Sequence, residues 1–127
     1  MVQLMSASRE ELIERHLIDL ESLTPELEGT AVISVEGLMI ASRLPNGLTD
    51  DLVASMSAAM LALGERIAHD LERGELSQVF IRGEFGYVLL MAVNENAVLT
   101  ALASEEAKLG LLFLDMKRAA SELRQLL

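Results

Sequence analysis

The sequence predicts an α/β (α+β) fold: a three-layer sandwich built on a five-stranded antiparallel sheet, with the element order αββαβββα. Helical and strand periodicities alternate along the chain in that order, and the short links between successive strands favour antiparallel pairing. Residues 87–93 and 97–103 are apolar on both faces, so this sheet needs cover on both sides. We therefore expect the middle helix on one face and the terminal helices on the other, in a single domain spanning residues 1–127.

The first helix and the first hairpin occupy the N-terminal part of the chain. A helix is expected over residues 8–23, where the sequence SREE supplies a capping box. Its apolar stripe consists of Leu12, Ile13, Leu17, Leu20 and Leu23. Two strands rich in Val and Ile follow at residues 30–35 and 38–43, and Glu36-Gly37 between them suits a tight turn.

The middle helix is the longest predicted element. Thr49 is its expected N-cap, and Asp50 and Asp51 complement the dipole of its first turn. The helix is expected to run to about Arg73 and to end at Gly74. It would then contain ~24 residues and span roughly 36 Å.

Three strands and a last helix are expected in the C-terminal part. The segment LSQVFIRGEFGYVLLMAVNENAVLTALA is interpreted as three strands separated by the turns GEFG and NEN. Ser104, Glu105 and Glu106 are expected to open the last helix, which runs to the C-terminus. Its apolar stripe is Leu109, Leu112, Phe113, Met116, Ala120, Leu123 and Leu127.

Apolar residues follow two sides of the middle helix. The broader stripe, expected to face the sheet, consists of Leu52, Met56, Ala59, Met60, Leu63, Ile67 and Leu71. The second contains mostly small residues, namely Ala54, Ala58, Leu61, Ala62 and Ala68. No charged residue occurs between Asp51 and Glu65. Either the alanines simply favour helix formation on a weakly exposed face, or they allow the close approach of a second backbone, such as the same helix of a second protomer.

Composition excludes several classes of function. With 20 acidic and 10 basic residues the net charge is −10, and only four aromatic residues are present, so nucleic-acid binding is not expected. Hydrophobic residues make up 51% of the chain, which is high for a small domain and suggests that a partner or a second copy covers part of the apolar surface. Without cysteines, a signal peptide or an apolar run of ~18 residues, the protein is expected to be cytoplasmic, with no membrane insertion.

No catalytic, cofactor-binding or metal site is expected. The Walker A, G-x-G-x-x-G and G-x-S-x-G motifs are absent from the sequence. Glu65 and His69 are four residues apart on the middle helix, but two ligands do not make a metal site and His16 is the only other histidine. The pairs of adjacent carboxylates lie near expected helix starts, where the helix dipole explains them. We therefore expect that the chain is not an enzyme.

Two segments resemble a known family. The segment AVISVEGLMIASRLP is similar to the first hairpin of the Roadblock/dynein light chain family, and VFIRGEFGYVLLMAV is similar to its third and fourth strands. The order of helices and strands also resembles that family from about Leu12 to Leu127. Among its members, the chain looks like the prokaryotic MglB-like proteins.

This resemblance implies a homodimer in which the middle helices pair and the third strands join edge to edge. The implied dimer interface comprises Ala58, Leu61, Val79, Phe80, Ile81 and Arg82. MglB-like proteins are partners of a small Ras-like GTPase, which they activate without an arginine finger by repositioning the GTPase's own groups. The implied partner-binding residues are Ala54, Ala58, Leu61, Ala62 and Glu65. Arg66 and Arg82 are the conceivable arginine fingers, but a solvated helix face and a strand end explain them more simply.

Three hypotheses about function follow. The first is a homodimeric regulatory module that binds a small Ras-like GTPase and has the potential to stimulate its GTP hydrolysis. The alternative is a non-catalytic scaffold or cargo adaptor without effect on nucleotide turnover. A third is a small-molecule sensor, which would need a pocket with convergent polar groups.

Overall fold

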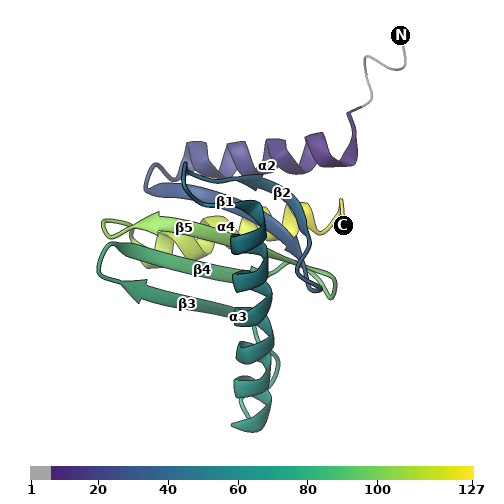
Figure 1. Cartoon of the computed structure of the whole chain (residues 1–127), viewed down its shortest axis with the longest axis vertical. Helices are drawn as coiled ribbons and strands as arrows, with labels where there is room; N and C mark the ends of the chain where they lie inside the picture. The colour runs from purple at the N-terminus through teal and green to yellow at the C-terminus, as the bar shows by residue number, and fades with distance from the viewer. Residues whose placement is uncertain (1–6) are drawn as a thin grey trace.

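The computed structural model of the chain describes residues 7–127 and confirms the predicted architecture (Figure 1). Its elements are α2 (Arg9–Leu23), β1 (Leu27–Ser34), β2 (Met39–Arg43), α3 (Asp50–Asp70), β3 (Gln78–Gly83), β4 (Gly86–Ala92), β5 (Ala97–Ser104) and α4 (Leu109–Leu123). Five antiparallel strands form one sheet in the order β2-β1-β5-β4-β3. Residues 79–82 therefore lie in a strand at the edge of the sheet, as predicted.

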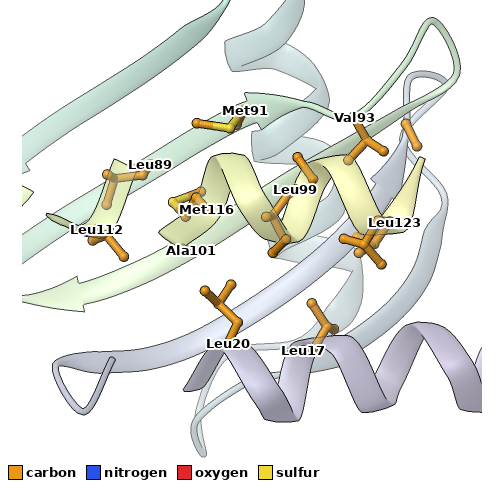
Figure 2. Close-up of a cluster of buried hydrophobic side chains, with 14 of the residues drawn as sticks. Leu17, Leu20, Leu89, Met91, Val93, Leu99, Ala101, Leu112, Met116 and Leu123 are labelled. Carbon is orange, nitrogen blue, oxygen red and sulfur yellow. The ribbon is translucent and has the colours of Figure 1, made fainter. Parts of the chain in front are cut away.

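The terminal helices cover one face of the sheet. Ile13, Leu17 and Leu20 of α2 and Leu112, Met116 and Leu123 of α4 are almost completely buried. Figure 2 shows several of these side chains between the two helices and the strands, where they meet Leu89 and Met91 of β4 and Leu99 of β5. This cluster is the larger of two hydrophobic cores, and it fixes α2 and α4 against the same side of the sheet.

The middle helix covers the opposite face. Val53, Ala54 and Leu61 of α3 pack against a smaller cluster on the strands, formed by Ala31, Ile33, Leu90 and Val98. Residues 97–101 of β5 are all buried, and alternate side chains enter the two clusters. The apolar character of both faces of β5, which predicted a sheet covered on both sides, is explained by this arrangement.

The last helix begins later than predicted. Ser104 pairs with Gly86 as the last residue of β5, and its N–H donates to the Glu26 carbonyl at 2.9 Å. Glu105 and Glu106 form a turn, and α4 begins at Leu109 with Lys108 as an N-cap that makes no side-chain capping bond. The expected start at Ser104 is therefore wrong, because Ser104 belongs to the paired strand and Glu105 and Glu106 form the turn that follows it.

The middle helix ends at Asp70, three residues before the predicted end. Glu72 adopts a left-handed backbone with φ of 57°. The Arg73 N–H donates to the Ala68 carbonyl at 2.7 Å, and the Glu72 N–H donates to the His69 carbonyl at 3.1 Å. These two bonds form a Schellman cap. Glu72 thus holds the position that Gly74 was expected to hold.

At Gly86 the backbones of β4 and β5 approach too closely to leave room for a side chain. Its φ is 148°, and a Cβ built on it would lie 2.2 Å from the Ala103 carbonyl oxygen. We expect Gly86→Ala to lower the free energy of unfolding by about 2 kcal/mol or more, because the backbone itself would have to move. Gly110→Ala is the matched control, since no atom lies within 4 Å of its built Cβ, and it should be neutral or stabilising by up to about 1 kcal/mol. Urea unfolding followed by circular dichroism measures both, and equal stabilities would contradict the prediction.

Candidate functional site

The candidate site is the surface of α3 that turns away from the sheet. The helix begins with Thr49, whose Oγ1 accepts a hydrogen bond from the Leu52 N–H at 3.2 Å, and Ser42 Oγ donates to Asp50 Oδ1 at 2.7 Å. The first bond caps the helix, and the second ties the start of α3 to β2. Figure 1 shows that α3 runs across the strands and continues beyond β3, so that its C-terminal part extends past the sheet.

The two apolar stripes of α3 face the opposite way from the prediction. Val53, Ala54, Ser57, Leu61 and Ala68 are buried toward the sheet. The larger residues of the other stripe are exposed: Leu52 (47%), Met56 (59%), Leu63 (60%), Ile67 (49%) and Leu71 (64%). The expectation that the broader stripe faces the sheet is therefore wrong for these five residues, and it holds only for Met60, which packs against the cluster of Ala31, Ile33, Leu90 and Val98.

Close packing explains the reversal. A Cβ built on Gly64 would lie 2.9 Å from Val79 Cγ2 and 3.0 Å from a Leu76 methyl carbon, so the helix passes near β3 at a residue without a side chain. Deeper in the core, the Thr100 hydroxyl donates to Ser57 Oγ at 2.9 Å. Small residues therefore occupy the inner side of α3 at Ser57 and Gly64, because the helix lies too close to the sheet for Leu or Met at those two positions.

We define the α3 outer face as Leu52, Met56, Ala59, Leu63 and Ile67. It lies on the side of the helix that no other element of residues 7–127 buries. The face is uncharged from Leu52 to Gly64, and four of its five residues are large and apolar. An apolar surface of this length on one helix is typical of an interaction site.

Some of the residues predicted to bind a partner lie on the exposed side of α3, and others lie against the sheet. Ala62 and Glu65 are exposed beside the α3 outer face. Ala58 is half-buried and lies near the β1–β2 turn, where a Cβ built on Gly37 would be 3.6 Å from its Cβ. Ala54 and Leu61, only 2% and 5% exposed, pack against the sheet, so the expectation that their side chains face outward is wrong. Periodicity identified both stripes but carried no signal for which one faces inward.

The four predicted interface residues of β3 lie on its two faces. Val79 is half-buried toward α3, and Ile81, on the same side by strand alternation, is 50% exposed. Phe80 is 49% exposed on the α4 side, where its ring makes an edge contact with Phe113 at 5.8 Å between centroids. The Arg82 guanidinium lies over the Tyr87 ring, 5.8 Å from its centroid. Val79 and Ile81 therefore extend the apolar surface of α3 toward the edge strand.

Acidic side chains gather at the C-terminal end of α3. An open groove of about 860 Å³ is lined by Glu65, His69, Glu72, Glu75 and Glu95, together with apolar atoms of Leu76 and Ala92. Arg66 Nε lies 3.5 Å from Asp70 Oδ2, one helical turn further along α3, and both side chains are well exposed. This ion pair therefore adds little stability. Within residues 7–127 no group of three or more His, Asp or Glu side chains is arranged to hold a metal ion. The groove thus gives the α3 outer face a negative border.

A second groove, of about 570 Å³, lies beside β2 and includes Arg43, Glu21 and Ser42. Arg43 Nε donates to Glu21 Oε2 at 2.8 Å, and this hydrogen bond is the main cause that raises the pKa of Arg43 above its ordinary value. Thr30 Oγ1 also donates to Glu21, at 3.3 Å. The strongest polar groups of this groove are paired with one another, so it offers few free groups to a small ligand.

Comparisons with known proteins give one consistent result. The family model of the Roadblock/LC7 domain matches residues 15–103. The Methanocaldococcus jannaschii protein MJ0310 is 35% identical over 113 residues, which cover 89% of this chain and 97% of that protein. A structure described as MglB with tetrameric arrangement superposes with a TM-score of 0.86 at 22% identity, covering 95% of this chain and 91% of that one. For the gliding protein MglB of Thermus thermophilus the TM-score is 0.82 at 21% identity, with 95% and 92% covered.

The orientation of α3 can be tested with two substitutions two residues apart. Leu61→Arg places a charge in the core between α3 and the sheet, and we expect it to lower the free energy of unfolding by more than about 3 kcal/mol. Leu63→Arg places the same charge on the α3 outer face, where water solvates it, so the variant should keep a native far-UV spectrum and cooperative unfolding. Circular dichroism with thermal unfolding distinguishes them. A folded Leu61→Arg protein together with an unfolded Leu63→Arg protein would restore the predicted orientation.

Proposed function

The chain belongs to the Roadblock/LC7 family, and from this membership we propose that it is a cytoplasmic homodimer that binds a small Ras-like GTPase and regulates it. As a Roadblock/LC7 domain with the MglB fold it is a regulatory interaction module and not itself an enzyme. The observation that carries the proposal is the α3 outer face, an exposed and uncharged apolar surface in a chain of net charge −10.

Self-association would cover two exposed features at once. Leu52, Met56 and Leu63 are each about half exposed or more, and burying them against a two-fold copy of α3 removes apolar area from water. No strand of residues 7–127 pairs with the outer edge of β3, and a second β3 would satisfy that edge with backbone hydrogen bonds. Val79 and Ile81 lie between these two features. Dimer contacts are therefore assigned to β3 together with Ala58 and the α3 outer face, while Leu61 supports the helix from inside.

The partner surface is assigned to the region beside the helix crossing. Two helices that cross at a typical angle cover each other only near the crossing point, so part of each α3 outer face stays exposed in the dimer. Ala62 and Glu65 lie beside that exposed part, and the acidic groove at the end of α3 adjoins it. A partner with basic groups around an apolar centre fits this surface. The likeness to MglB-type proteins supports a GTPase as that partner.

Activation, in this proposal, requires no arginine from the chain. Arg82 stacks on Tyr87, on the opposite side of β3 from Val79. Arg66 is 80% exposed, and its one ion pair within residues 7–127 is with Asp70. Neither guanidinium is held in a fixed position on the α3 outer face, so stimulation of hydrolysis would come from repositioning the GTPase's own groups.

The dimer is tested by light scattering at about 10 µM. We expect about twice the chain mass of 13.9 kDa for the wild type and the monomer mass for Leu63→Arg, because a charge in a desolvated helix contact is costly. Leu114→Arg on α4 is the matched control, since it is similarly exposed but lies on the other face of the sheet, and it should stay dimeric at this concentration. A monomeric wild type would refute the proposed assembly.

The GTPase assignment is tested in two steps. Calorimetry with GTP and Mg²⁺ should detect no binding by the chain alone, because its sequence has no phosphate-binding loop. Small GTPases encoded in the same genome are then captured on immobilised protein in their GTP and GDP states, and hydrolysis by the captured GTPase is measured with and without the chain.

Ala62→Arg, checked to remain dimeric, is the discriminating variant. We expect it to weaken GTPase binding at least tenfold, while hydrolysis is faster with wild-type protein than without it. Binding without any change in hydrolysis would identify a scaffold or adaptor. Unchanged binding by Ala62→Arg would place the docking surface elsewhere.

A further inference from the structure

The side of α3 that carries Ala58, Ala62, Glu65 and His69 forms one wall of an extended surface beside the helix. These residues follow one another at spacings of four, three and four, so they lie in one stripe along the helix. The stripe leads into the open groove of about 860 Å³ at the end of α3, which Glu65 and His69 line. It lies on a different side of α3 from the large residues of the α3 outer face, so it stays open when that face is covered in a dimer.

Two turns form the opposite wall of this surface. The turn between β1 and β2 reaches α3, since a Cβ built on Gly37 would lie 3.6 Å from Ala58 Cβ. The turn between β4 and β5 contributes to the lining of the groove. The Val35 N–H donates to the Asn96 carbonyl at 2.9 Å and so joins the two turns. Both turns lie on the same side of α3 in Figure 1, and the surface therefore runs from Ala58 to the groove.

The end of this surface near Ala58 is apolar and is held in place by hydrogen bonds. Leu38 follows Gly37 and is 68% exposed. Its N–H donates to Ser34 Oγ at 3.0 Å, and its carbonyl accepts from the Ser34 N–H at 2.8 Å. The turn is therefore already ordered, and a molecule that binds there loses little affinity to ordering its backbone. We define the α3 side surface as the groove together with Leu38, Ala58 and Ala62.

The groove end of the α3 side surface is apolar at its floor and acidic around it. Leu76 and Ala92 contribute apolar atoms, and most of the lining of the groove is apolar. Four carboxylates surround this floor and form no ion pair within residues 7–127: Glu65, Glu72, Glu75 and Glu95.

The negative charge of the groove is not balanced by the arginines nearby. No Lys or Arg of residues 7–127 is among the residues that line it. The neighbouring Arg66 pairs with Asp70, and Arg73 Nε donates to the Leu71 carbonyl at 3.0 Å. A ligand that brings basic groups to the groove would therefore meet carboxylates that have no partner within the described chain.

We propose that the α3 side surface binds an extended peptide segment of a partner protein, in which one or two aliphatic residues are followed by several basic residues. The proposal rests on the partner surface assigned above and specifies the chemistry of the segment that docks there. The aliphatic residues cover Leu38 and Ala62, and the basic residues pair with the carboxylates around the groove. From Ala58 to His69 the helix rises roughly 16 Å, which an extended segment of about five residues spans.

The probe is a fluorescein-labelled peptide with two leucines followed by four lysines, titrated with the full chain and followed by fluorescence anisotropy. We expect saturable binding of one peptide per chain, with a Kd of about 10–100 µM at low ionic strength. A peptide with two serines followed by four lysines should bind at least threefold more weakly, and one with two leucines followed by four glutamates should not bind. Absence of saturable binding by the first peptide, or equal binding of the serine peptide, would overturn the proposal.

A matched pair of charge variants locates the basic end of the peptide. Glu65→Gln combined with Glu95→Gln should weaken binding of the leucine–lysine peptide at least fivefold. Glu10→Gln combined with Glu11→Gln removes the same charge from the first turn of α2 and should weaken it less than twofold. All four side chains are exposed, so both variants should keep the wild-type circular dichroism spectrum. An equal loss in the two variants would mean nonspecific attraction to a chain of net charge −10 and would refute the site.

A second pair of variants locates the aliphatic end. Leu38→Ser should weaken the leucine–lysine peptide at least threefold and leave binding of the serine–lysine peptide unchanged, because the two changes remove the same contact. Leu114→Ser is the control at a similarly exposed leucine on α4, and it should affect neither peptide. If Leu38→Ser weakens both peptides equally or neither of them, the assigned contact is wrong.

The remaining outcomes separate this inference from the proposed function. The peptide assay contains no GTPase, so the expected binding pattern without capture of any GTPase would refute the GTPase assignment alone. Capture of a GTPase without saturable peptide binding would refute this inference alone. A change in the mass of the Glu65→Gln and Glu95→Gln variant by light scattering would show that a second copy occupies the groove, which also contradicts the inference.

Discussion

The two-sided burial of β5 is the constraint on which the rest of the structure depends. This strand lies at the centre of the sheet, paired with β1 and β4, and residues 97–101 are buried on both faces. A strand of this kind is stable only if helices cover both sides of the sheet. Two helices share one face and a single helix serves the other, so the cover is unequal. The exposed apolar surface of α3 follows from this unequal cover.

A single helix covers its face of the sheet by lying close to it. Ala54, Ser57 and Gly64 permit this approach, and most of the larger residues of α3, namely Leu52, Met56, Leu63, Ile67 and Leu71, are left on the outside. In most surface helices the large apolar residues face inward and the outside is charged. Here the inner side is limited by distance, so the larger apolar residues lie where only another molecule can bury them.

The element order and the layers could be predicted from the sequence because they depend on period and on link length. The edge position of β3 came only from the family resemblance. Which side of α3 packs against the sheet could not be predicted, because periodicity identifies an apolar stripe but not whether it faces the sheet or the solvent. The prediction placed the larger residues against the sheet. Ala54 and Leu61 were consequently assigned to a surface that they do not reach. The start of α4 failed for a different reason, because Glu105 and Glu106 resemble a first helical turn whereas pairing of Ser104 with Gly86 extends the strand. Both errors concern tertiary contacts, which local pattern does not encode.

The part of α3 that extends beyond β3 has a consequence for dynamics. From Val53 to Leu61 the helix is anchored by buried side chains, whereas from Ala62 to Asp70 only Ala68 is buried. Backbone amides of the distal turns are therefore protected mainly by local helix bonds, which open at low free energy, whereas those of the proximal turns open only with the core. A molecule that packs on the distal turns must first suppress this fraying and so gives up part of its binding energy to order them. The same region then reports occupancy directly, as a slowing of hydrogen exchange confined to the end of one helix.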